Sequence, residues 1–206
     1  MSPASLDKIK VDALALLGAV VRVYSRDLAL GEVGAGGSAR AGASIPEMPC
    51  TGLLYGRIQS GKTVAMIALV AAAIDNGFRA IIVLTSDNMK LVAQTADRFG
   101  ALEGTLALDA TVRDIWEDDH KHISKSLAQS GVVFVCSKNQ KRLDDLIRFL
   151  DEIGAPSHPA LVLDDEADQA TLDANLARNS RARSKGMATV DPTAIHDLVV
   201  QRLRKT

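Results

Sequence analysis

The stretch GRIQSGKT, residues 56–63, decides how this sequence is interpreted. It matches the pattern G-x-x-x-x-G-K-[S/T] at every specified position. An expected short strand, TGLLYG (51–56), precedes it, and an expected alanine-rich helix (62–76) follows it. A strand, loop and helix in this order turn backbone N–H groups toward a phosphate at the helix N-terminus. The stretch therefore predicts a nucleotide phosphate-binding loop.

Each part of this loop has an expected role. The nucleotide-binding residues are expected to be Gly56, Arg57, Ile58, Gln59, Ser60, Gly61, Lys62 and Thr63. Lys62 is expected to reach the β- and γ-phosphates of ATP, and the Thr63 hydroxyl is expected to be a ligand of Mg²⁺. The predicted cofactors are therefore ATP and Mg²⁺.

An acidic run at the end of an apolar strand supplies the second half of the predicted site. The sequence LVLDDEAD (161–168) places carboxylates where parallel sheets form ligand sites, at the carboxyl end of a strand. Asp165 is expected to hold Mg²⁺, and Glu166 is expected to orient or deprotonate the attacking water. Asp164 and Asp168 are expected to support them. Asp164 as the Mg²⁺ carboxylate is a one-residue-shifted alternative.

The chain divides by composition into three predicted parts. Residues 1–30 form a helical segment, since apolar residues recur there at helical spacing over 5–29. Residues 31–48 form a glycine-rich, flexible connector. Residues 49–206 form the nucleotide-binding lobe.

Within the lobe, strands alternate with helices, which predicts a parallel sheet with helices on both faces. The expected strands, besides 51–56, are residues 79–85, 131–137 and 160–168. The expected helices, besides 62–76, are residues 88–99, 111–129, 138–153 and a closing helix in 192–206. Residues 101–110 are ambiguous and could form a short edge strand. The predicted fold is an α/β, RecA-like P-loop three-layer sandwich preceded by an N-terminal helix.

Composition and charge set limits on the protein class. The chain has 206 residues, 47% of them hydrophobic, and a formal net charge of −1, so no overall basic field attracts it to nucleic acid or an anionic membrane. No window holds 18 uninterrupted apolar residues, and no membrane partner is expected. Cys50 and Cys136 are far apart and match no metal-site spacing, so reduced thiols and a cytoplasmic location are expected.

Residues 165–168 spell DEAD, so the chain resembles the first RecA-like lobe of a superfamily-two helicase. Four blocks resemble in order those of the Z-one domain, a family of helicase-like ATPases often linked to restriction or phage defence. These blocks are GLLYGRIQSGKT, GFRAIIVLTSDNMKLVAQTADRF, CSKNQKRLDDLIRFL and LVLDDEADQATLD. The resemblance implies a helicase-like DNA translocase that hydrolyses ATP.

The resemblance also implies contacts with a nucleic-acid backbone, DNA more than RNA. Two strand-end regions match such contacts: Thr85, Ser86 and Gln94 in the first, Ser137, Lys138 and Asn139 in the second. Backbone contacts of this kind use hydroxyls, amides and helix N-termini more than net positive charge. Ordinary helix capping is an equally good interpretation of these residues.

Helicases of this type close ATP between two lobes, and the second lobe supplies an arginine finger. No second lobe follows the DEAD motif in this sequence, so the chain is expected to be a fragment of a longer protein. By itself it is expected to hydrolyse little ATP, because the missing arginine costs on the order of 10³ to 10⁵ in turnover. An alternative function is a nucleotide-dependent switch that regulates a partner protein.

Overall fold

The computed structural model describes residues 3–33, 61–100, 108–112, 120–167, 181 and 193–203. The chain divides into two compact units, Met1–Asn76 and Gly77–Thr206. Of the predicted connector 31–48, residues 31–33 continue the N-terminal helix and the remainder lies outside the described residues. The predicted strand 51–56 also lies outside them.

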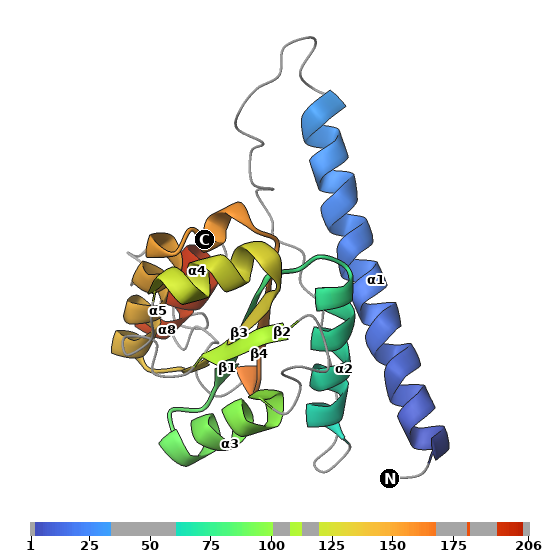
Figure 1. The fold of residues 1–206 in the computed structure, drawn as a ribbon, viewed down its shortest axis with the longest axis horizontal. Coiled ribbons are helices and arrows are strands. Elements are labelled where there is room, and N and C mark those ends of the chain that lie inside the picture. Colours follow the sequence, from blue (N-terminus) through green and yellow to red (C-terminus); the bar gives the residue numbers. More distant parts are fainter. Residues whose placement is uncertain are drawn as a thin grey trace. The chain divides into compact units, whose positions relative to one another are not determined.

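Two helices form the described part of the first unit. Helix α1 (Pro3–Val33) confirms the helix predicted over 5–29 and extends it at both ends. It packs alongside α2 (Lys62–Asp75), as Figure 1 shows. Ala13 and Leu17 are buried on α1. These two residues are four positions apart, so they lie on the same face of the helix.

Helix α2 ends at a glycine that adopts a left-handed conformation. The backbone N–H of the C-cap residue Asn76 donates to the carbonyls of Ala72 and Ala73, at 3.1 and 3.0 Å. Gly77 follows with φ of +88°. The sequence predicts this C-cap, since a glycine follows the expected helix 62–76, and the geometry confirms it, because only glycine enters this region without a steric cost.

Gly77→Ala is expected to lower the free energy of unfolding by about 1–2 kcal/mol, because an L-residue is strained at positive φ. A Cβ at this position would meet nothing within 4 Å, so the cost comes from the backbone and not from a clash. Gly18→Ala within α1 is the matched control, with an expected gain of about 0.5–1 kcal/mol. Thermal denaturation of both variants tests the prediction, and a stabilised Gly77→Ala would contradict it.

The second unit is built on a parallel sheet, which confirms the predicted α/β class. Its described strands are β1 (Ala80–Thr85), β2 (Leu108–Val112), β3 (Gly131–Ser137) and β4 (Ala160–Asp164). Their order is β2-β3-β1-β4, and each neighbouring pair is parallel. Every residue of β1 and β3 is buried. Strands in the middle of a parallel sheet are covered on both faces, which explains their uninterrupted apolar sequences.

Helices cover the two faces of this sheet. Alternate residues of β1 and β3, Ile82 and Phe134 among them, share a hydrophobic core with α4 (His120–Gln129) and α5 (Gln140–Glu152). Phe134 packs edge-to-face on Phe149 of α5, with ring centroids 6.2 Å apart. Helix α3 (Met89–Gly100) contacts β1, β2 and β3 and lies on the side of the sheet opposite α4 (Figure 1).

Side-chain caps mark where two of the predicted helices begin. The sequence offers Asp87 or Asn88 as the cap of α3, and Asn88 is the residue used, since its Oδ1 accepts a hydrogen bond from the Lys90 backbone N–H at 3.0 Å. Asn139 caps α5 by accepting from the Lys141 N–H at 3.1 Å. Both caps satisfy a donor that the first helical turn leaves free.

The structure corrects the helix predicted over 111–129. Residues 111 and 112 belong to β2, residues 113–119 lie outside the described part of the chain, and the described helix α4 runs from His120 to Gln129. The ambiguous stretch 101–110 does contribute residues 108–110 to β2, one of the two outer strands of the described sheet. Pairing with β3 decides this conformation, because edge-strand preference depends on the neighbouring strand more than on local sequence.

The chain returns to the core near its C-terminus. After the short 3₁₀ turn η2 (Ala155–Ser157) and strand β4, the predicted closing helix appears as α8 (Ala194–His196), which continues into the wider π-helical segment η3 (Asp197–Arg202). Leu198, Val199 and Leu203 join the core on the α5 side. No helix in the described ranges is both long and apolar enough to span a membrane.

Candidate functional site

The last three residues of the phosphate-binding pattern stand at the start of α2, in the first unit. Gly61 precedes the helix with φ of +83°, which explains why this position of the pattern needs glycine. Its carbonyl accepts the first helical hydrogen bond, from the Ala65 N–H at 3.0 Å. Lys62 and Thr63 are therefore the first two helical residues, at the helix N-terminus, where backbone N–H groups favour an anion. Residues 56–60 lie outside the described part of the chain.

The other predicted site residues belong to the second unit, at the carboxyl edge of its sheet. The register pairs Thr85 with Ser137, and Leu84 with Asp164. Beyond these pairs, the Asp165 N–H donates to the Leu84 carbonyl at 2.9 Å. The ends of β1, β3 and β4 therefore lie side by side. The acidic turn, Asp165 and Glu166, is thereby next to the regions that follow β1 and β3.

A buried lysine joins these strand ends. The side chain of Lys138, directly after β3, is 1% exposed. Its Nζ donates to Asp164 Oδ1 at 3.1 Å, to the Asp165 carbonyl at 2.7 Å and to the Glu166 carbonyl at 2.8 Å. An ammonium has three N–H donors, so each finds an acceptor. A buried charge is tolerated when it is paired and fully hydrogen-bonded in this way.

The acidic turn has an unusual backbone. Glu166 has φ of +55°, and it is the sole non-glycine residue with positive φ in the described part of the chain. This left-handed conformation costs an L-residue roughly 1–2 kcal/mol. Glu166 is exposed and Asp165 is half-buried, so both carboxylates lie near solvent at the sheet edge. Strained backbone of this kind persists where surrounding contacts hold it, and it clusters at functional sites.

Asp164 and Asp165 differ in what binds their carboxylates. Asp164 is paired with the Lys138 ammonium. The Asp165 carboxylate, in contrast, accepts no hydrogen bond from the described residues, since its recorded contacts are made by its backbone. Of the two carboxylates, only that of Asp164 is paired with a cation among the described residues.

The predicted nucleic-acid contacts occupy different environments. Thr85 and Ser137 are buried, whereas Asn139 is exposed and caps α5. Ser86 Oγ is buried and has no hydrogen-bond partner among the described residues. Gln94 is exposed on α3. These contacts stay predictions, and one by Lys138 would require its ammonium to leave three protein acceptors.

The sequence interpretation missed the structural role of Lys138. A lysine directly after a buried strand carries no local signal of burial, and lysine is among the residues least often buried. One signal of this role was available in the sequence: the three carboxylates at the end of β4 need a compensating cation. The sequence could not show that β3 and β4 are separated by a single strand.

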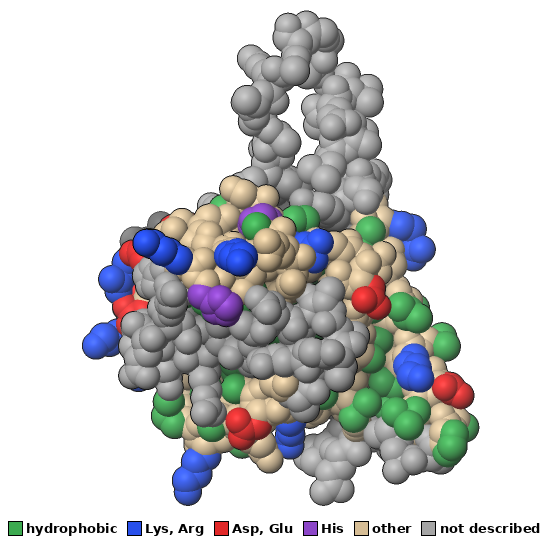
Figure 2. Space-filling view, viewed as in Figure 1, with side chains coloured by type: hydrophobic (Ala, Val, Ile, Leu, Met, Phe, Trp, Pro, Cys, Tyr) green, Lys and Arg blue, Asp and Glu red, His purple; other side chains and the backbone are tan. Residues whose placement is uncertain are grey.

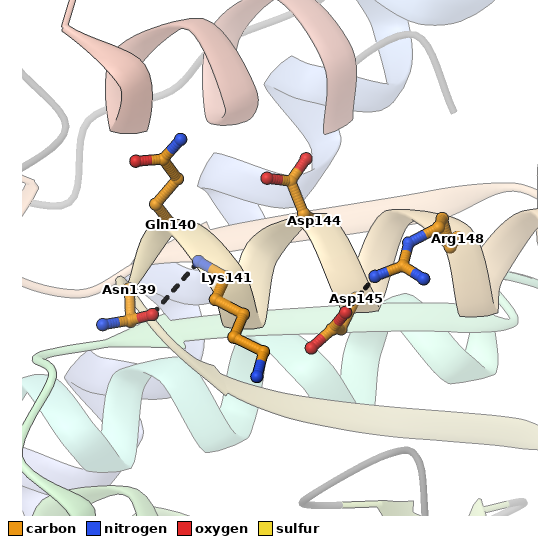
Figure 3. Close-up of a pocket in the computed structure, with 6 residues that line it drawn as sticks. All are labelled: Asn139, Gln140, Lys141, Asp144, Asp145 and Arg148. Carbon is orange, nitrogen blue, oxygen red and sulfur yellow. Dashed lines mark hydrogen bonds and ion pairs between the residues drawn. The ribbon is translucent and has the colours of Figure 1, made fainter.

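A shallow groove lies on the outer surface of α5. Figure 3 shows its lining side chains along one stretch of the helix, with Arg148 paired to Asp145. The lining residues are Asn139, Gln140, Lys141, Asp144, Asp145 and Arg148. Acidic and basic groups alternate there, so neither positive nor negative charge dominates the groove.

No group of three or more His, Cys, Asp or Glu side chains in the described ranges is arranged to hold a metal by itself. The Mg²⁺ site predicted from Thr63 and Asp165 needs fewer protein ligands, because Mg²⁺ takes one or two carboxylates together with phosphate oxygens and water. Comparisons with protein-family models, with curated proteins and with solved structures found no match. The functional argument therefore rests on the residues themselves.

Proposed function

We propose that this chain is the ATP-binding lobe of a helicase-like DNA translocase. One observation supports it above the others: two carboxylates follow a strand of a parallel sheet, on a strained turn held by a buried lysine. Such an edge is where open α/β sheets bind ligands. The pattern GRIQSGKT, with Gly61 in the left-handed conformation before α2, adds the expected phosphate-binding element.

The residues present fit the chemistry of ATP and Mg²⁺. Lys62 and the backbone N–H groups at the start of α2 would bind phosphate oxygens, and Thr63 would contribute a hydroxyl to the metal. Asp165 would be the carboxylate ligand, because that of Asp164 is held by Lys138. Mg²⁺, when bound, would neutralise charge on the phosphates. Glu166 would orient the attacking water or accept its proton.

The proposed nucleic-acid partner is DNA, contacted through strand-end hydroxyls and amides. On the face drawn in Figure 2, basic and acidic side chains are interspersed, which suits backbone contacts by neutral groups better than a broad basic patch. The Ser86 hydroxyl, which has no hydrogen-bond partner among the described residues, is a suitable donor for such a contact. Three further parts of the proposal rest on the resemblance to the Z-one domain. They are a second RecA-like lobe with an arginine finger, a role in a restriction or phage-defence system, and a cytoplasmic location.

Lys62→Ala is expected to weaken ATP binding by roughly 10- to 100-fold, because a hydrogen bond to a charged phosphate contributes about 1.5–3 kcal/mol. Folding should persist, since Lys62 is incompletely buried at a helix start. Lys90→Ala, at an exposed lysine of α3, is the control and should bind as the parent does. Titration calorimetry with ATP and Mg²⁺ measures the difference. Equal affinity for parent and Lys62→Ala would refute the phosphate-binding loop.

DNA-stimulated hydrolysis separates the translocase from a nucleotide switch. The rate of phosphate release is measured with and without single-stranded or duplex DNA, with the second lobe supplied. A translocase should accelerate on DNA, because DNA brings its two lobes together around ATP. A rate that DNA leaves unchanged, combined with ATP-dependent binding of a protein partner, would support the switch instead.

A further inference from the structure

The Lys138 ammonium connects two strands that are not neighbours. Lys138 follows β3, its acceptors follow or end β4, and β1 lies between these strands. Neighbouring strands lie about 4.8 Å apart, so β3 and β4 are roughly 10 Å apart, and the lysine side chain together with its hydrogen bonds spans this gap over the end of β1. Its own backbone N–H donates to the Thr85 carbonyl at 2.9 Å. The base of the side chain is thus attached to β1 while its tip holds the turn after β4.

The acceptors of this ammonium explain the shape of the turn. The Asp165 and Glu166 carbonyls both approach the same nitrogen, at 2.7 and 2.8 Å. Two consecutive carbonyls usually point in different directions, and here Glu166 adopts φ of +55°. Hydrogen bonds from a charged donor are stronger than those between neutral groups, so they offset the strain. The same bonds set the direction in which the Asp165 and Glu166 side chains leave the backbone.

We propose that Lys138 is a positioning residue for Asp165 and Glu166. It touches neither nucleotide nor metal, and it acts by fixing the backbone from which both carboxylates extend. This inference rests on the proposed ATPase function for its catalytic consequence. The structural part of the inference, that the ammonium controls the turn, does not depend on the ATPase function. This structural part rests on three hydrogen bonds that the Lys138 side chain donates while it is 1% exposed.

A residue that only stabilises the fold would have different consequences. Loss of stability alone would lower the folded fraction and leave the turn unchanged in the molecules that fold. Loss of positioning would loosen the turn in folded protein and slow the chemical step while ATP affinity stays the same. The test therefore needs folded variants and a direct measure of the turn.

The experiment compares Lys138→Met, the double variant Lys138→Met/Asp164→Leu and the control Lys141→Met in the full chain. Methionine retains the length and apolar stem without the charge. The double variant removes both charges together, which avoids an unpaired buried carboxylate and keeps a folded sample available. Lys141 is exposed, and its side chain lies on the surface of α5 (Figure 3). Hydrogen exchange of the backbone amides of residues 165–167 measures opening of the turn.

We expect exchange at these amides to be about 10-fold faster or more in both variants that lack the ammonium, and unchanged in Lys141→Met. The Asp165 amide is the most informative, because its N–H donates to the Leu84 carbonyl in the parent. Lys138→Arg should restore slow exchange in part, since it restores a charged donor. Parental exchange rates in folded Lys138→Met or in the double variant would overturn the proposal.

Hydrolysis supplies the second measurement. In single-turnover reactions with protein in excess of ATP and the second lobe supplied, the double variant should be slower by about 10-fold or more with ATP affinity within about twofold of the parent. A parental hydrolysis rate with a loosened turn would overturn the positioning role. If the parent itself binds no ATP, the proposed function fails, while the exchange measurement still decides whether Lys138 controls the turn.

Discussion

Glu166→Gln is expected to slow ATP hydrolysis by about 10²-fold or more while ATP binding persists. The amide retains the size of the side chain but loses the carboxylate that would orient or deprotonate water. Binding should survive because the proposed phosphate and metal contacts belong to Lys62, Thr63 and Asp165. The backbone is unaffected by this change, since glutamine and glutamate have the same cost at the φ of +55° observed here.

Single-turnover hydrolysis of labelled ATP measures this effect, with protein in excess and the second lobe supplied. Glu152→Gln makes the same chemical change at an exposed position of α5, outside the proposed site, and should hydrolyse ATP at the parent rate. Binding is followed separately by calorimetry. If Glu166→Gln hydrolyses ATP as fast as the parent, Glu166 is not the catalytic carboxylate.

Lys138→Met is expected to lower the free energy of unfolding of the second unit by about 3–5 kcal/mol, because it leaves a buried partner charge uncompensated. Asp164 is the group affected, since its side chain is only 18% exposed. The Asp165 and Glu166 carbonyls lose their ammonium donor in the same variant. An added Asp164→Leu should recover much of this loss by removing the carboxylate that would otherwise remain unpaired.

Urea denaturation followed by tryptophan fluorescence measures this loss. The chain has one tryptophan, Trp116, and its sequence position lies in the unit Gly77–Thr206, so the signal reports on that unit. Lys141→Met is the control, with an expected change within about 0.5 kcal/mol for an exposed side chain. A loss no larger than that of the control would show that the Lys138 interactions contribute nothing net to stability.

Local sequence was sufficient for most helices and strands. The continuous apolar runs of β1 and β3 predicted buried parallel strands, and the strand predicted at 131–137 matches β3 at both ends. Burial on both faces removes the need for polar alternation, so such strands are recognisable without knowledge of their partners. Gly77 was also predictable, because its role depends on the backbone of a single residue.

Edge and terminal segments were less predictable. The helix expected from residue 111 proved to be strand through Val112, where pairing with β3 overrides the local preference. The closing helix has the expected position, but its last part is π-helical. In both cases the packing partner lies far away in sequence, so no local pattern carries the information.

The sequence by itself determined the chemistry available at the candidate site: a phosphate-binding pattern ending in Gly61, Lys62 and Thr63, and an acidic strand end. It left Asp164 as an alternative to Asp165 for the metal ligand, and it predicted Lys138 as a nucleic-acid backbone contact or part of a helix cap. Only the tertiary structure showed that Lys138 pairs with Asp164, because the strand order leaves a single strand, β1, between β3 and β4. A buried ammonium must be paired where it lies, so it binds the Asp164 carboxylate and two carbonyls, while the Asp165 carboxylate has no hydrogen-bond donor among the described residues.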